Sequence, residues 1–219
     1  MPQAARPARS SPQPRRPDAR SKLLDAALAV IRAKGYAATT VDELCATAGV
    51  TKGAFFHHFP SKEALAVAAA DHWSDMTGAL FAAAAYHDLP DPLDRVLGYL
   101  AFRKALLAGT LPEFTCLVGT MVQETFETAP AIRDACGRSI SGHAETLEAD
   151  IDAAIAASGL APGWTAASLA LHTQAVLQGA FILAKATGDP MVAADSVDHL
   201  IRYLALLFGR PADTTTERP

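Results

Sequence analysis

The sequence contains few cysteines and none of the motifs that mark common enzyme sites. Its three cysteines, Cys45, Cys116 and Cys136, form neither a CxxC pair nor a zinc-ligand spacing. No nucleophile elbow, P-loop, Rossmann fingerprint or metal-binding motif is found along the chain. We therefore expect no enzyme, no cofactor and no metal site. The odd number of cysteines and the lack of a secretory signal favour a cytoplasmic protein.

Patterns typical of β-strands and of membrane spans are also lacking. No segment alternates apolar and polar residues for long enough to form a strand, so we expect an all-α fold. The most apolar stretch, residues 169–184, is interrupted by His172, Gln174 and Gln178, and we expect no contact with a membrane. Residues 1–17 hold five prolines and four arginines and are predicted to be a disordered basic arm; residues 211–219 are predicted to be a disordered tail.

Charge is distributed unevenly along the chain. Residues 1–62 contain 10 Lys and Arg against 4 Asp and Glu, whereas residues 63–219 contain 9 against 19, which together give the net charge of −4. A basic N-terminal part on an acidic body suits a protein that meets phosphates at one end. The alternative is that the two parts differ by accident.

Helical patterns separated by glycines and prolines cover the chain after residue 17. Two short helices are expected between residues 40 and 60. The other expected helices span about 18–34, 61–86, 91–109, 112–127, 130–158, 165–186 and 192–208.

The most informative segment is 39–65, TTVDELCATAGVTKGAFFHHFPSKEAL. Thr40 and Glu43 have the spacing of a capping box, which satisfies free amides at a helix start. Gly49 ends this first short helix, and Thr51 begins a second one. Two short helices joined by a tight glycine-containing turn are the layout of a helix-turn-helix.

This segment resembles the DNA-binding domain of TetR-type (tetracycline-repressor-like) transcriptional regulators. The resemblance is sharpest at residues 39–41, 48–51 and 58–65, and it extends back through 22–27 and 35–36. It implies a three-helix DNA-binding domain at 18–62, with 63–210 as a helical domain for ligand binding and dimerisation. That C-terminal part is similar to the family only in its length and its helical character.

The second short helix is expected to read double-stranded DNA. Phe55 and Phe59, four residues apart, are predicted to face the protein interior, which leaves Lys52, Gly53 and Phe56 for base edges. The family more often has Tyr where this chain has Phe56, so a phosphate hydrogen bond from that ring is not available. The residues expected at the DNA, several by resemblance alone, are Thr40, Thr51, Lys52, Gly53, Ala54, Phe56, His57, His58 and Lys62.

Some of these residues have a simpler interpretation. Lys62 can be a solvated charge at a helix start, and His57 and His58 can be surface histidines without a contact. Adjacent helical residues point about 100° apart, which makes a metal shared by the two histidines improbable.

The last two predicted helices, 165–186 and 192–208, carry apolar residues on more than one face. We expect them to pair with their copies in a homodimer, as the resemblance also implies. The two-fold symmetry of the dimer then places one DNA-binding domain on each half of a palindromic operator. The alternative is that these faces are buried within one protomer.

Large and polar side chains scattered through 63–186 are expected to enclose a small-molecule inducer, because apolar walls with a few polar groups form ligand pockets. Gln123, His143 and His172 are the strongest candidates, since an unpaired buried polar group is costly. A thiol sensor at Cys116 is possible chemically, but an inert cysteine is commoner. The expected ligand-binding residues are Trp73, Phe102, Phe114, Cys116, Gln123, His143 and His172.

Three functional classes follow. The first is a repressor that binds a palindromic operator as a dimer and is released by a small molecule. The second is a DNA-binding protein of the same fold without such an inducer. The third is an enzyme, against which the lack of catalytic motifs argues. Loss of operator binding on adding ligand separates the first two, and DNA binding by the N-terminal part separates both from the third.

Overall fold

The structure, a computed structural model, describes residues 18–210. The disordered segments predicted for 1–17 and 211–219 lie outside these residues. Between 18 and 210 the chain is helical and has no β-strand, which confirms the predicted all-α fold. The elements are α1 (Ala19–Lys34), α2 (Val41–Ala48), α3 (Lys52–His58), α4 (Lys62–Ala82), the 3-10 helix η1 (Ala85–Asp88), α5 (Pro92–Ala105), α6 (Leu111–Phe114), α7 (Leu117–Thr125), α8 (Pro130–Glu145), α9 (Glu148–Ser158), α10 (Ala166–Thr187) and α11 (Met191–Leu207).

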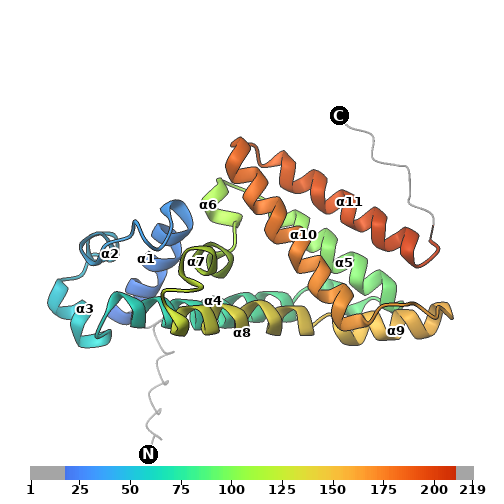
Figure 1. Ribbon diagram of the computed structural model, residues 1–219, viewed down its shortest axis with the longest axis horizontal. Coiled ribbons are helices and arrows are strands. Elements are labelled where there is room, and N and C mark those ends of the chain that lie inside the picture. Colours follow the sequence, from blue (N-terminus) through green and yellow to red (C-terminus); the bar gives the residue numbers. More distant parts are fainter. Residues whose placement is uncertain (1–17, 211–219) are drawn as a thin grey trace, which may run out of the picture.

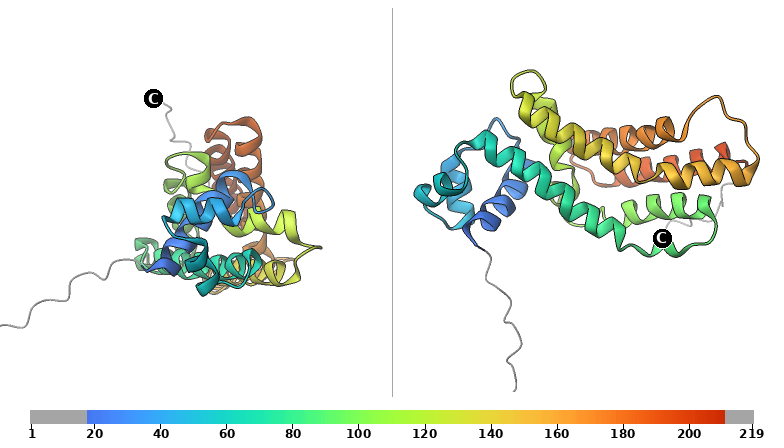
Figure 2. Two further views of the ribbon diagram at one scale, coloured as in Figure 1. Left: turned by 90° about the vertical axis from the view of Figure 1, so that its left-hand side faces the viewer. Right: turned by 90° about the horizontal axis from the view of Figure 1, so that it is seen from below.

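Helix α4 connects the two ends of the molecule (Figure 1). The helices α1, α2 and α3, which we call the head, gather at its N-terminal end, and α5, α9, α10 and α11 gather at the other end. Helix α8 packs along α4, and the view from below in Figure 2 shows these two helices side by side. Motion of α4 therefore moves the head relative to the C-terminal helices.

Two apolar cores hold this arrangement together. The first joins Leu44 and Phe55 of the head to Met121 of α7 and Ile132 of α8. The second lies among α5, α9, α10 and α11 and includes Leu204, which has no exposed surface. Burial of apolar area stabilises each core by roughly 25 cal/mol per Å². Because the first core contains residues of α7 and α8, the head packs on the rest of the protomer.

Two of the predicted helices end earlier than expected. The helix predicted for 61–86 ends at Ala82, and a turn into η1 buries Phe81 and Tyr86 against the second core. The helix predicted for 91–109 ends at Ala105. In both cases tertiary packing overrides the helical preference of the local sequence.

Two other predicted helices are divided. The segment 112–127 breaks where Thr115 adopts an extended conformation (φ −76°, ψ 156°), and the thiol of Cys116 then accepts a hydrogen bond from the Gly119 amide (3.4 Å) at the start of α7. The segment 130–158 breaks between α8 and α9, where Leu147 is buried and the Thr146 hydroxyl donates to the His143 carbonyl (2.7 Å). Neither break contains the glycine or proline by which sequence patterns mark helix ends.

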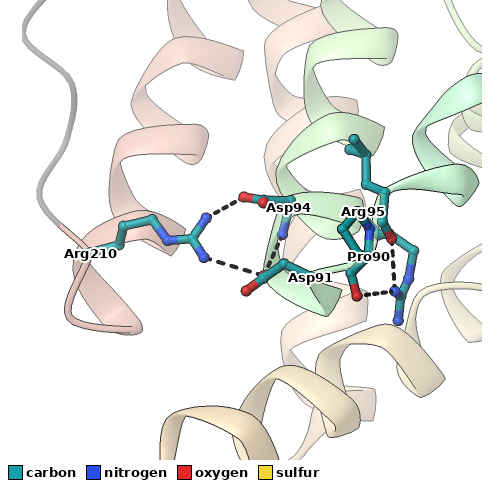
Figure 3. A network of polar contacts seen from close by, with 6 residues as sticks. Pro90, Asp91, Asp94, Arg95 and Arg210 are labelled. Carbon is teal, nitrogen blue, oxygen red and sulfur yellow. Dashed lines mark hydrogen bonds and ion pairs between the residues drawn. The ribbon is translucent and has the colours of Figure 1, made fainter.

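A network of polar contacts joins the start of α5 to the residues after α11 (Figure 3). The guanidinium of Arg210 pairs with Asp91 (3.2 Å) and with Asp94. Arg95 donates to the carbonyl of Pro90 (3.2 Å) and pairs with Asp150 of α9 (2.7 Å). These contacts fix the end of the bundle that lies far from the head.

Candidate nucleic-acid interface and ligand cavity

Thr40 begins α2 with one half of the predicted capping box. Its hydroxyl accepts a hydrogen bond from the amide of Glu43 (3.2 Å). The Glu43 carboxylate forms an ion pair with Lys34 at the end of α1, so the reciprocal half of the box was predicted wrongly. A cation is a stronger partner for a carboxylate than a neutral amide is. This pair ties α2 to α1.

The turn between α2 and α3 has the predicted chemistry. Gly49 adopts a left-handed conformation (φ 65°), which glycine accepts without strain, and the next amide, that of Val50, donates to the Cys45 carbonyl (3.0 Å). The hydroxyl of Thr51 then accepts from the amide of Ala54 (3.1 Å) and starts α3. Local hydrogen bonds thus set the angle between the two helices.

Helix α3 presents one face to the interior and one to solvent. Phe55 and Phe59 are buried in the first core, as predicted. Phe56, which is 55% exposed, and His57 lie on the solvent side, whereas His58 is half-buried. The ring of Phe56 lies 5.1 Å from that of Phe55, and its exposed part is available for contact with DNA.

Lys52 and Gly53 lie at the exposed start of α3. The Lys52 ammonium lies 2.6 Å from the carboxylate of Asp42, and both side chains are more than half exposed. Exposed pairs contribute only about 0–1 kcal/mol, so Lys52 can exchange this partner for a phosphate or a base. A Cβ added at Gly53 would meet only the Thr51 hydroxyl, at 3.7 Å, so the protomer itself does not require glycine there.

Lys62 already has partners in the protein. Its ammonium donates to the carbonyls of Tyr36 (3.0 Å) and Thr39 (2.9 Å) and lies 4.2 Å from the centre of the Tyr36 ring. Burial lowers the pKa of this lysine from its ordinary value. Lys62 therefore connects the start of α4 to the loop between α1 and α2 through two hydrogen bonds. One N–H of its ammonium remains for the predicted phosphate contact.

A cavity of about 50 Å³ lies among α4, α5, α8 and α10. It adjoins a more open cavity of about 240 Å³ along α7 and α10, with which it shares Cys116, Gln178 and Phe181. Movement of these three side chains would join the two spaces. The inner cavity is lined by Trp73, Thr77, Arg103, Phe114, Cys116, Val118, Ser139, Ile140, His143, Gln174, Gln178 and Phe181.

The predicted ligand-binding residues separate into three groups. Trp73, Phe114, Cys116 and His143 come together at the inner cavity, and Gln123 lines the open cavity beside Cys116. Phe102 lies instead in the second core, with its ring 5.3 Å from that of Phe81. His172 is exposed on α10, and its ring packs against Tyr203 of α11 (5.5 Å).

A chain of hydrogen bonds crosses one wall of the inner cavity. The Tyr99 hydroxyl lies 3.0 Å from Nε2 of His143 and accepts from the side-chain amide of Gln174 (3.1 Å). Burial, with a contribution from the charge of Arg103, lowers the pKa of His143 to about 4. His143 is therefore neutral near pH 7 and can either donate or accept a hydrogen bond.

Arg103 is the charged residue among the cavity residues that the sequence did not predict. Its guanidinium lies over the ring of Phe81 (5.3 Å) and near the rings of Tyr99 and Phe181 (both 6.0 Å). A basic residue in the last turn of a helix is ordinarily a solvated charge that complements the helix dipole, so the position of Arg103 in the sequence does not indicate a cavity. The position of Gln174 does indicate a special environment, because this polar residue interrupts the most apolar stretch of the chain.

The wall of the open cavity touches the head directly. The Glu124 carboxylate, on α7, accepts hydrogen bonds from the amides of Tyr36 (3.2 Å) and Ala37 (2.7 Å) in the loop after α1. Gly35 makes this approach possible: its φ is +90°, and a Cβ there would lie 2.2 Å from a Glu124 oxygen. A residue that lines a cavity thus also holds the loop that precedes the helix-turn-helix.

Arg32 of α1 makes a second link. Its guanidinium donates to the Glu113 carbonyl of α6 (2.8 Å) and lies 5.3 Å from the centre of the Trp73 ring, which lines the inner cavity. Lys185 of α10 donates to the Arg32 carbonyl (3.3 Å) and to the Thr120 hydroxyl (3.1 Å). The head is therefore connected through α6, α7 and α10 to residues around both cavities.

Helices α10 and α11 pack against each other and leave large apolar side chains in solvent. The contact between His172 and Tyr203 shows that exposed residues of the two helices adjoin. The exposed large apolar side chains of this pair are Leu171, Ile182, Leu183, Met191, Tyr203 and Leu206.

By length and composition α10 could cross a membrane, which differs from the expectation drawn from its polar interruptions. In this structure 44% of the most apolar 18-residue stretch of α10 is buried, and the helix packs on α8, α9 and α11. A core helix of a folded domain can be as long and as apolar as a membrane-spanning helix. The buried polar residues Thr173 and Gln174 are satisfied by hydrogen bonds within the bundle.

Comparison with known proteins assigns the two parts of the chain. Residues 23–69 match the family model described as bacterial regulatory proteins of the tetR family, and residues 92–200 match the tetracyclin repressor-like C-terminal domain. The HTH-type transcriptional regulator LmrA of Bacillus subtilis is 28% identical over 139 residues, which cover 60% of this chain and 70% of LmrA. YerO of the same organism, an uncharacterised regulator, is 36% identical over 58 residues, 26% of this chain; the match spans only 20% of YerO.

Solved structures share the fold. A TetR-family regulator of Agrobacterium tumefaciens superposes with a TM-score of 0.75 at 20% identity, covering 84% of this chain and 96% of that one. The TetR-family regulator CifR, solved with a 26-base-pair double-strand operator DNA, has a TM-score of 0.71 at 22% identity and covers 87% of this chain and 98% of its own. The helix-turn-helix, the helical second domain and both family matches agree, and the chain belongs to the TetR family of DNA-binding transcriptional regulators, which are not enzymes.

Proposed function

We propose that this regulator is a cytoplasmic repressor that binds a palindromic operator as a homodimer and leaves it when a small molecule enters the bundle. The observation that carries this proposal is that α7 both lines a cavity and holds the loop before the helix-turn-helix, through Glu124 and the amides of Tyr36 and Ala37. A ligand that displaces α7 must therefore disturb the head.

The exposed face of α3 is the surface proposed to read bases. Lys52 can donate to guanine O6 or N7, Gly53 allows close approach of the backbone, and Phe56 can lie against a thymine methyl group. Thr40, Thr51, Ala54, His57, His58 and the free N–H of Lys62 are proposed to hold the DNA backbone. The operator-bound relative CifR, which has the same fold, supports this use of the head.

The exposed apolar side chains of α10 and α11 support a dimer in which each pair of helices packs on its copy. An isologous four-helix interface would bury these side chains on both protomers and place the two heads on the same side of the dimer. Half-sites of such an operator should then lie about one helical turn of DNA apart, or a multiple of it.

The inner cavity of about 50 Å³ is small for an organic ligand, so binding should widen it. We infer that displacement of Gln178 and Phe181 joins it to the open cavity and pushes on α7. The contacts of α7 and α6 with the loop after α1 and with Arg32 then transmit the displacement to the head. The spacing of the two heads changes, and operator affinity falls.

The test begins with selection of bound sequences from a random double-stranded DNA library, which should return a palindrome. A compound collection is then screened for molecules that raise the melting temperature of the protein, because a ligand that binds only the folded state stabilises it. At least one such compound should release the selected DNA. If stabilising compounds leave operator binding unchanged, the chain belongs to the alternative class, a DNA-binding protein without a small-molecule inducer.

A further inference from the structure

We propose that the inner cavity binds an organic anion, a carboxylate on an apolar body, and that Arg103 pairs with the carboxylate. This inference rests on the proposed inducer function and names the chemical class of the ligand. It follows from the guanidinium of Arg103, which within the described residues lacks the carboxylate partner that Arg95 and Lys104 have on the same helix.

The other cations of α5 are paired with carboxylates, whereas Arg103 has no such partner in the part of the chain that the structure describes. Arg95 and Lys104, on the same helix as Arg103, pair with Asp150 (2.7 Å) and Asp198 (2.6 Å). Within residues 18–210, Arg103 forms no ion pair with a carboxylate, and its Nε is fully buried without a hydrogen-bond partner. A guanidinium presents its donors in a planar fork that fits a carboxylate with two parallel hydrogen bonds.

The other walls of the cavity suit the same ligand. Among the described residues that line it, none carries a carboxylate that could repel an anion. The amide of Gln174 and the hydroxyl of Ser139 are neutral polar groups, and His143 is neutral near pH 7. The described walls of the inner cavity therefore carry one positive charge, that of Arg103, without a carboxylate beside it.

Aromatic and apolar side chains form the remainder of the walls. Trp73, Phe114 and Phe181 line the inner cavity, and Ile182 lines the open cavity beside it. Such walls match an apolar body of roughly the size of two fused rings once the two spaces join, since their volumes are about 50 and about 240 Å³.

A purely structural role for Arg103 is the competing explanation. Its guanidinium lies over three aromatic rings, and cation–π contacts stabilise a desolvated cation. Ring faces, however, accept no strong hydrogen bond, so the buried Nε remains unsatisfied. Arg103 is partly buried, and a desolvated donor without a partner costs stability, so replacing it with an apolar side chain of similar length should leave the ligand-free protein as stable or make it more stable.

Two matched probes, 2-naphthoate and the neutral 2-naphthamide, test the inference by calorimetric titration of the full chain. The wild type should bind the acid about 10- to 100-fold more tightly than the amide, the range expected for a charged hydrogen-bonded pair. Arg103→Met should abolish that preference, and Arg103→Lys should keep part of it. Arg138→Met, on the exposed face of α8 (side chain 66% exposed), is the matched control and should bind both probes like the wild type.

A second measurement, the melting temperature, tests whether Arg103 has a structural role instead. Without ligand, Arg103→Met should melt at or above the wild-type temperature; a loss of several degrees would make Arg103 a structural cation and overturn the inference. Equal affinity of the wild type for the two probes would also overturn it. If neither probe binds while the melting screen yields a neutral inducer, the choice of an anion is wrong and the proposed function stands.

Discussion

At the scale of single residues, Lys62 differs most from its sequence-based interpretation. The family resemblance implies a phosphate contact, and the simpler alternative is a solvated charge. In the structure its ammonium donates to two backbone carbonyls, of Tyr36 and Thr39, and lies on the Tyr36 ring. A lone residue at a helix start gives no indication of carbonyls 23 and 26 positions earlier, because their approach is created by packing of α4 on α1.

This difference leads to a prediction for the two lysines. Lys62→Met should lower the free energy of unfolding by about 1.5–3 kcal/mol, because two part-buried hydrogen bonds from a charged group are lost. Lys52→Met, whose side chain is exposed, should change it by less than about 0.5 kcal/mol and should instead weaken operator binding, with relaxed preference at particular base pairs. Urea denaturation and DNA titration of both variants test this. An unchanged stability of Lys62→Met would return Lys62 to the role of a surface charge.

His143 leads to a prediction about pH. Its pKa is about 4 in the folded protein and about 6.5 in an unfolded chain. Between these values the unfolded chain binds a proton that the folded chain does not, so the free energy of unfolding falls as pH falls, by up to about 1.4 kcal/mol per pH unit from this group. His143→Gln should flatten this dependence between pH 7 and pH 5 in denaturation curves. A variant that keeps the full wild-type slope would contradict the buried, neutral state of His143.

At the scale of secondary structure, the sequence predicts the start of most helices and misses breaks made by packing. The turn after α2 and the starts of α2, α3 and α4 follow from Gly49, Thr40, Thr51 and Ser61, whose side chains or backbone act locally. The breaks at Thr115 and at Leu147 have no such residue, since they arise where the chain turns to bury its side chains in the bundle. For the same reason the cavity could be predicted only in part.

Helix α7 carries the proposed coupling, and Glu124 makes two hydrogen bonds from it to the loop after α1. Glu124→Gln keeps the size of the side chain but removes its charge, which should weaken the hydrogen bonds from the amides of Tyr36 and Ala37. We expect the ligand-induced loss of operator affinity to shrink in this variant, and its ligand affinity is measured separately because Glu124 lines the open cavity. Fluorescence anisotropy with labelled operator, with and without inducer, measures this. Full release by the inducer in Glu124→Gln would exclude this contact from the coupling.

The exposed faces of α10 and α11 allow a test of the dimer with two leucines of α11. Leu206 is 65% exposed, so Leu206→Glu should leave the protomer folded and weaken the dimer. Leu204 is fully buried within the protomer, so Leu204→Glu should unfold it, since an unpaired charge would enter the core. Sedimentation velocity and circular dichroism separate the two results. A wild-type monomer at micromolar concentration would rule out the proposed interface.

At the scale of the whole molecule, the division of charge and the helical pattern anticipate a DNA-binding head on a helical body. The family models confirm this assignment over 23–69 and 92–200. Where the two parts meet could not be predicted, because the first core combines residues of the head with residues of α7 and α8, which are separated from the head in sequence by α4, α5 and α6. In the proposed function, this shared core would connect the ligand cavity to the head.

The central claim is that ligand and operator bind to one coupled molecule, and reciprocal affinity tests it most directly. The affinity of a compound found by the melting screen is measured by calorimetry with the free protein and with the protein saturated by selected operator. Coupling of about 1–3 kcal/mol predicts that operator weakens ligand binding roughly 5- to 150-fold and that ligand weakens operator binding by the same factor. Equal ligand affinity with and without saturating operator would contradict the account.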